Sequence, residues 1–225
     1  MADLPVARVP HLALIVPVLN EAGLLPGLLE HIRSLHGWQE CIIADGGSDD
    51  NSVAIAREHA VNCHVLQVPG GRHRQLNAAL AHTRCQGVLL LAADVRLHRH
   101  ACLQVRQSVA AGRHGCLRQR SALASRLMRA QDAASRLRAR LLGGAYMDQV
   151  PFFPSTALRR IGGFRALGPY DSADAGYRLG ARHFAALPIP ALSSCRAYRH
   201  GFWRQTLHNQ HHRCRYMATQ VQWEE

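Results

Sequence analysis

The sequence predicts an α/β fold, built on an open, mostly parallel, Rossmann-like sheet with helices on both faces. In residues 10–97, short apolar runs alternate with segments whose apolar residues recur at helical spacing. Short loops join these segments, and polar side chains follow several of the apolar runs. The chain has 225 residues, which is enough to bury the core of such a sheet.

The first half contains seven expected elements. The expected strands cover 12–18, 41–44, 64–68 and 88–91, and the expected helices cover 24–35, 52–59 and 74–84. The run from Leu12 to Val18 is continuously apolar, as in a parallel strand covered on both faces. In the first helix, Pro26 falls in the first turn, where proline is tolerated.

Breaker and capping residues set the later boundaries. The second strand ends at Asp45, and residues 48–50 can cap the following helix. The sequence Pro69-Gly70-Gly71 ends the third strand, and the fourth strand leads to Asp94. Ligands of such sheets bind at the carboxyl ends of the strands, so we expect a binding site there.

A basic amphipathic helix is expected within residues 121–142. Its apolar positions recur every three or four residues: Leu123, Leu127, Ala130, Ala134, Leu137 and Leu141. Arginines occupy its other faces: Arg126, Arg129, Arg136 and Arg140. Two interpretations remain open: a helix packed on the sheet with solvated arginines, or a contact with a membrane surface or a lipid phosphate.

The charge is divided unevenly along the chain. All 27 basic residues are arginine, against 15 acids, for a net charge of +12. Residues 1–60 sum to −5 and the remainder to +17. Acid clusters suit metal and sugar, whereas guanidinium groups suit phosphate. An apolar share of 48% with 19% charged residues excludes the class of disordered acidic or basic tail proteins.

The expected compartment is the cytoplasm. The seven cysteines form no C-x-x-C pair, and neither a signal peptide nor a membrane-spanning run of about 20 apolar residues is evident. The surplus of arginine leaves open a peripheral location at the inner membrane surface.

Six motifs in order resemble the family 2 glycosyltransferases, which have the nucleotide-sugar-binding GT-A fold. They lie at 15–21, 45–52, 71–79, 89–94, 159–164 and 199–204, within a match that spans residues 12–216. The resemblance is narrower to a small bacterial subgroup with Gly-Arg-x-x-Gln-x-Asn and Arg-His-Gly-x-Trp-Arg motifs. That subgroup also has a Gly-Asp-Gln motif, which here reads Met147-Asp148-Gln149.

The resemblance implies a role for each matching residue. The nucleotide and its diphosphate would contact Pro17, Asn20, Glu21, Asp45, Arg72, Asn77, Arg199 and Arg204. Substrate would be positioned by Asp148, Gln149, His200 and Trp203. Asp94 would bind Mg²⁺ or Mn²⁺, and Asp171 or Asp174 would be the catalytic base.

Two departures from the family pattern stand out. Where relatives have Asp-x-Asp or His-Ala-Asp, this chain has Ala92-Ala93-Asp94. Where relatives have Glu-Asp before the acceptor-side helix, it has Asp171-Ser172, with Asp174 two residues on.

We therefore expect one glycosyltransferase domain over residues 1–225. Residues 10–97 would be the nucleotide-sugar-binding half, and 98–225 a helical acceptor-side half and tail. The expected reaction is inverting sugar transfer from a nucleoside diphosphate sugar, with UDP-sugars favoured, to an acceptor that can be membrane-associated or polyanionic. The alternative is a degenerate relative that binds nucleotide or a partner without catalysis. Nucleic acid is a disfavoured partner, although the charge alone is compatible with it.

Overall fold

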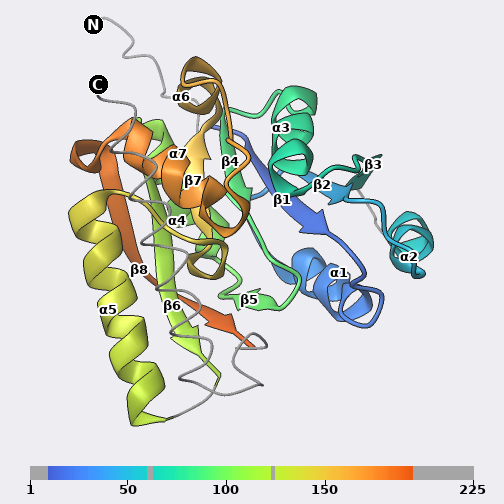
Figure 1. The fold of residues 1–225 in the computed structure, drawn as a ribbon, viewed down its shortest axis with the longest axis horizontal. Helices are drawn as coiled ribbons and strands as arrows, with labels where there is room; N and C mark the ends of the chain where they lie inside the picture. Colours follow the sequence, from blue (N-terminus) through green and yellow to red (C-terminus); the bar gives the residue numbers. More distant parts are fainter. Residues whose placement is uncertain (1–9, 60–62, 123–124, 195–225) are drawn as a thin grey trace, which may run out of the picture.

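The computed structural model describes residues 10–59, 63–122 and 125–194 (Figure 1). These residues form an eight-stranded sheet in the order β3-β2-β1-β4-β7-β6-β8-β5. The strands are β1 (Leu12–Val18), β2 (Glu40–Asp45), β3 (Cys63–Gln67), β4 (Gly87–Leu90), β5 (Val95–Leu97), β6 (His114–Ser121), β7 (Pro151–Pro154) and β8 (Phe184–Ser193). The α-helices are α1 (Leu25–Ser34), α2 (Ser52–His59), α3 (Arg72–His82), α4 (Ala101–Ala110), α5 (Arg126–Leu142), α6 (Ser155–Arg160) and α7 (Asp171–Leu179). Three 3₁₀ turns complete the list: η1 (Met147–Gln149), η2 (Gly168–Tyr170) and η3 (Ala181–His183).

The predicted α/β architecture of the first half is confirmed. Strands β1 to β4 pair in parallel, and all seven expected elements are present. The expected strand at 12–18 and helix at 52–59 match β1 and α2 from end to end. Strand β7 then pairs antiparallel with both β4 and β6, whereas β6 and β8 are parallel.

Both faces of the sheet are covered by helices, as the apolar run of β1 predicted. Leu12, Leu14 and Val16 point into one core with α1 and α4, and Ala13 and Ile15 point into another with α3. This alternation follows from the two-residue period of a strand. Because both faces of β1 are covered, all seven of its residues are apolar.

The second half contains more strand than the sequence analysis expected. Strands β6, β7 and β8 join it to the same sheet. The sequence does not predict β8, because the strand contains Pro188 and Pro190 and proline is rare inside a sheet. The structure accommodates them at an irregularity, where the β6 register moves from Cys116 to Arg118 while β8 moves from Ala186 to Pro190.

Helix α5 is present, but the expected apolar face points away from the sheet. Leu127, Leu137 and Leu141 are 47%, 59% and 67% exposed. The buried positions are instead Met128, Asp132 and Ala139. Polar contacts fix this orientation: the backbone N–H and the hydroxyl of Ser121 donate to the Asp132 carboxylate, and the Arg138 guanidinium lies over the Tyr146 ring. Apolar periodicity does not record such contacts.

Within the described ranges, no helix is both long enough and apolar enough to cross a bilayer.

Candidate functional site

The loops after β1 and β2 are joined to each other by hydrogen bonds. The Asn20 N–H donates to Ser48 Oγ at 2.9 Å, and the Asp49 N–H donates to Asn20 Oδ1 at 2.9 Å. The Glu21 N–H donates to Ser52 Oγ at 2.9 Å. Asn20 adopts φ 55°, a left-handed conformation that asparagine tolerates better than most residues. The predicted nucleotide residues Asn20 and Glu21 are therefore bonded to the loop and helix that follow Asp45.

Asp45 lies at the end of β2 and shapes the loop that follows. Its Oδ2 accepts from the N–H groups of Gly47 and Ser48 at 3.0 and 3.1 Å, and its Oδ1 accepts from the Ser48 hydroxyl. The residue is 1% exposed. The structure therefore gives Asp45 a role in holding this loop, and its contact with the nucleotide base stays a prediction.

Gln75 is a structural residue of this site that the sequence analysis did not single out. Its side-chain amide donates to the carbonyls of Val18 at 2.8 Å and Ala44 at 2.6 Å. Pro17 pairs with Ala44 in the β1–β2 ladder, so Gln75 fixes the strand ends beside it. The available signal was the Gln of the Gly-Arg-x-x-Gln-x-Asn motif.

Arg72 and Asp171 are predicted for different tasks, but the structure brings them together. Arg72 Nε is 2.8 Å from Asp171 Oδ2, and Arg72 Nη2 is 2.9 Å from Asp171 Oδ1. Arg72 also donates to the Gly168 carbonyl at 2.7 Å, and the Ser172 N–H donates to Asp171 Oδ1 at 2.6 Å. The Asp171 side chain is 0% exposed and that of Arg72 is 30% exposed. A predicted diphosphate ligand thus neutralises a predicted base.

Asp174, the other predicted base, is also in a buried ion pair. Arg178 Nε is 2.7 Å from Asp174 Oδ2, and Arg165 Nη1 is 3.8 Å from Asp174 Oδ1. The Asp174 side chain is 1% exposed. Arg178 further donates to the carbonyls of Ile161 and Gly163, so this pair anchors the turn before α7.

Asn77 holds the same turn from α3. Its side-chain amide donates to the Phe164 carbonyl at 2.8 Å and accepts from the Phe164 N–H at 2.8 Å. A Cβ at Gly163, whose φ is +74°, would lie 2.3 Å from Asn77 Oδ1. The structure thus gives Asn77 a packing role, and its nucleotide role stays a prediction.

Asp94 lies in the loop after β4, beside the end of β8. Its Oδ2 accepts from Ser194 Oγ at 2.6 Å, and its carbonyl accepts from the Ser194 N–H at 3.2 Å. Oδ1 has no hydrogen-bond partner among the described residues, and the side chain is partly exposed. Mg²⁺ and Mn²⁺ prefer such oxygen ligands and are held by one or two carboxylates together with phosphate oxygens. The single carboxylate therefore fits a metal shared with a diphosphate.

A separate group of metal-type ligands lies at the other end of the sheet. In the part of the chain that the structure describes, ligand atoms of Glu40, His64 and His82 lie within 4.8 Å of one another. Glu40 begins β2, whereas Asp45 ends it. This group is therefore distinct from the predicted Asp94 site.

Asp148 and Gln149 belong to an internal polar network. Gln119 donates to Asp148 Oδ2 at 2.6 Å, while Asp148 Oδ1 is buried without a partner among the described residues. Burial raises the pKa of Asp148 above its usual range, against the opposing effect of the Arg138 charge. Gln149 accepts from Arg138 at 3.0 Å and donates to the Ser135 carbonyl at 3.3 Å. Their role in positioning substrate stays a prediction.

Four other predicted residues lie outside the described residues. These are Arg199, His200, Trp203 and Arg204.

The comparisons with known proteins agree with this fold. The family model "Glycosyl transferase family 2" matches residues 13–140. A mannosyltransferase from Pyrobaculum calidifontis, solved with GDP-Man and Mn²⁺, is 19% identical with a TM-score of 0.64 over 82% of this chain and 57% of that chain. TarS 1–349 from S. aureus, solved with UDP, is 14% identical with a TM-score of 0.66 over 82% of this chain and 60% of that chain.

A third solved structure has higher coverage. Glucosyl-3-phosphoglycerate synthase from Mycobacterium tuberculosis, solved with Mn²⁺, UDP and glucosyl-3-phosphoglycerate, is 17% identical with a TM-score of 0.60. The match covers 83% of this chain and 73% of that chain. No curated protein matches the sequence. On the match to more than half of its length, the chain belongs to glycosyl transferase family 2.

Proposed function

We propose that the protein transfers a sugar from a nucleoside diphosphate donor, preferably a UDP-sugar, to an acceptor hydroxyl with inversion at the anomeric carbon. The observation that carries this proposal is the pair of hydrogen bonds that joins the loop after β1 to the loop after β2, through Asn20, Ser48 and Asp49. It gathers polar residues from β1 and β2 at the carboxyl ends of parallel strands, where α/β proteins bind nucleotides. Family membership and the nucleotide complexes of the structural neighbours support the same assignment.

In the proposed site each residue acts on one part of the donor. The Asp45 carboxylate accepts from an N–H of the base, and the Arg72 guanidinium binds the diphosphate. One oxygen of Asp94 would hold Mg²⁺ or Mn²⁺, and that ion would supply positive charge where the diphosphate leaves.

The acid–base step needs a free carboxylate. The acceptor oxygen bonds to the anomeric carbon as the bond from that carbon to the diphosphate breaks, and the acceptor proton moves to Asp171 or Asp174. In the structure each of these groups is in an ion pair, so it can take the proton only after separating from its arginine. A diphosphate bound by Arg72 would compete with Asp171 for the guanidinium. Donor binding would thereby release the proposed base.

The first experiment is a thermal-shift panel of UDP-, GDP- and dTDP-sugars, each with and without Mn²⁺. A ligand that binds only the folded protein raises its melting temperature. We expect the largest Mn²⁺-dependent shift with a UDP-sugar and its loss in Asp94→Ala. The control is Glu30→Ala, at an exposed position of α1. An unchanged Mn²⁺-dependent shift in Asp94→Ala would contradict the metal assignment.

The buried ion pairs and the Ala92-Ala93 departure favour a second candidate function, which is nucleotide binding without catalysis. Hydrolysis of an α-linked donor in water distinguishes the two functions. An inverting enzyme releases the β-anomer first, which proton NMR detects. Donor binding without any hydrolysis, in the presence of Mn²⁺, would favour the non-catalytic function.

A further inference from the structure

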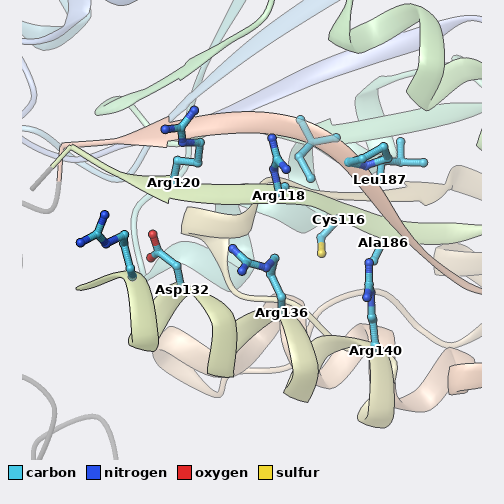
Figure 2. Close-up of a pocket in the computed structure, with 11 residues that line it drawn as sticks. Cys116, Arg118, Arg120, Asp132, Arg136, Arg140, Ala186 and Leu187 are labelled. Carbon is cyan, nitrogen blue, oxygen red and sulfur yellow. The ribbon is translucent and has the colours of Figure 1, made fainter. Parts of the chain in front are cut away.

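A groove of about 560 Å³ lies between α5 and the strands β6 and β8 (Figure 2). Its wall is strongly basic, because five of the side chains that line it are arginines: Arg118, Arg120, Arg129, Arg136 and Arg140. No family motif includes these residues, and none of the loops of the proposed donor site lines the groove.

Two elements contribute these arginines, and each presents them in a regular pattern. Arg129, Arg136 and Arg140 follow one flank of α5, at separations of seven and four residues. Arg118 and Arg120 are two residues apart on β6, the spacing that returns a strand to the same face. Figure 2 shows Arg136 and Arg140 extending from α5 toward the strands.

The positive charge of the groove is not balanced by the described residues. Asp132 is the one acid in the lining, and it is 6% exposed. Both of its oxygens accept from Ser121, at 2.9 Å from the backbone N–H and 2.7 Å from the hydroxyl. None of the five arginines forms an ion pair with a carboxylate of the described residues. Such a cluster of like charges attracts an anion.

The groove leads toward the proposed catalytic end of the sheet. Arg120 pairs with Leu192 in the β6–β8 ladder. Ser194, whose hydroxyl donates to the Asp94 carboxylate, is two residues beyond Leu192, or about 7 Å along an extended chain. A ligand in the groove can therefore extend toward Asp94 along β8.

We propose that this groove binds the phosphate-bearing part of the acceptor. Guanidinium groups match phosphate oxygens in geometry, and several of them together accommodate more than one negative charge. The identification of the ligand as an acceptor rests on the proposed transferase function, whereas the anion site itself rests on the arginines alone. The phosphate ester can belong to a soluble molecule or to a lipid headgroup.

The direct test measures pyrophosphate binding by calorimetry in the presence of saturating UDP, which competes for the donor site, and without Mn²⁺, which pyrophosphate would chelate. We expect the double variant Arg136→Gln/Arg140→Gln to weaken this binding by about tenfold or more. The matched control is Arg126→Gln, an exposed arginine of α5 outside the groove, which should bind as the parent does. Arg118→Gln/Arg120→Gln tests the opposite wall and should have the same effect as the first double variant.

The UDP-induced rise in melting temperature is measured on the same samples and checks that each variant is folded. Unchanged pyrophosphate affinity in either double variant would overturn the proposed site. If UDP gives no shift in the parent while the arginines still control pyrophosphate binding, the transferase assignment fails and the anion site stands.

A second set of probes separates the sources of the phosphate. Glycerol 3-phosphate represents the soluble ester, and vesicles of phosphatidylcholine with or without phosphatidic acid represent the lipid. A lipid acceptor predicts vesicle binding that requires both Arg136/Arg140 and the exposed Leu137 and Leu141 of α5. A soluble acceptor predicts glycerol 3-phosphate binding that Leu137→Ser/Leu141→Ser leaves unchanged. A third outcome is that duplex DNA binds more tightly than either phosphate probe and that the same arginine variants lose this binding. It would overturn the acceptor proposal and make the groove a nucleic-acid site.

Discussion

The guanidinium of Arg72 and the carboxylate of Asp171 form two parallel hydrogen bonds of 2.8 and 2.9 Å, although 99 residues separate them in the chain. Arg72 begins α3 in the first half of the chain, and Asp171 begins α7 in the second half. Because the planar guanidinium fork matches a carboxylate, this pair fixes the orientation of one half against the other. It also links a proposed donor ligand to a proposed base.

Removing the cation of this pair should destabilise the protein. Arg72→Gln leaves the buried Asp171 carboxylate without its charge partner, which costs about 3–5 kcal/mol for a fully buried pair. The partial exposure of Arg72 reduces the expected loss to about 2 kcal/mol. Urea unfolding measures it, and Arg72→Gln/Asp171→Asn should recover part of the loss. An Arg72→Gln protein as stable as the parent would show that the pair contributes nothing to folding.

Gly163 and Gly162 provide a matched pair of substitutions. Both have a left-handed φ, +74° and +77°, so alanine at either position is strained by about 1 kcal/mol. Only at Gly163 would the new Cβ also meet Asn77 Oδ1, at 2.3 Å. We expect Gly163→Ala to lower the free energy of unfolding by about 1–3 kcal/mol more than Gly162→Ala does. Equal losses would mean that Asn77 moves aside without cost.

Gln75 should contribute to stability through the two strand carbonyls that it joins. Gln75→Ala leaves the carbonyls of Val18 and Ala44 without this donor, at a cost of about 1–3 kcal/mol. Gln104→Ala, at an exposed position of α4, is the control and should stay within about 0.5 kcal/mol of the parent. Chemical denaturation of the three proteins decides whether the two substitutions differ.

The raised pKa of Asp148 predicts a pH-dependent effect of Asp148→Asn. Because the folded protein binds this proton more tightly than the unfolded chain, stability falls as the pH rises from the usual pKa of 3.8 through the raised one. Asparagine does not titrate. Relative to the parent, Asp148→Asn should therefore gain stability across that window and then level off. Melting temperatures of both proteins between about pH 3.5 and 7 test this, and a difference that is constant with pH would contradict it.

The orientation of α5 can be tested without any ligand. Leu137→Ser and Leu141→Ser should change the free energy of unfolding by about 0.5 kcal/mol or less, because both side chains are exposed. Met128→Ala, at a buried position, should cost about 2 kcal/mol or more. If the leucine substitutions cost more stability than Met128→Ala, the leucine face of α5 would be the buried one, as periodicity predicted.

Local patterns determined the first half of this protein. The strand from Leu12 to Val18 is buried on both faces, and such a strand must be continuously apolar. Likewise, the apolar runs before Asp45 and Asp94 predicted that both carboxylates lie at the carboxyl ends of parallel strands, where they are found, and their binding roles stay predictions.

The second half depended on contacts between distant residues. Pro188 and Pro190 of β8 lie where its register with β6 is irregular, and the hydrogen bonds from Ser121 to Asp132 hold α5 with its leucines turned outward. The pairing of Arg72 with Asp171 and the convergence of arginines from α5 and β6 likewise require the folded chain. Sequence periodicity reports which positions of one element share a face, whereas ion pairs and hydrogen bonds between elements decide which way that face points. The sequence thus predicts the α/β architecture of the first half, whereas contacts between elements of the folded chain set how the proposed base is restrained and where the surplus arginines gather.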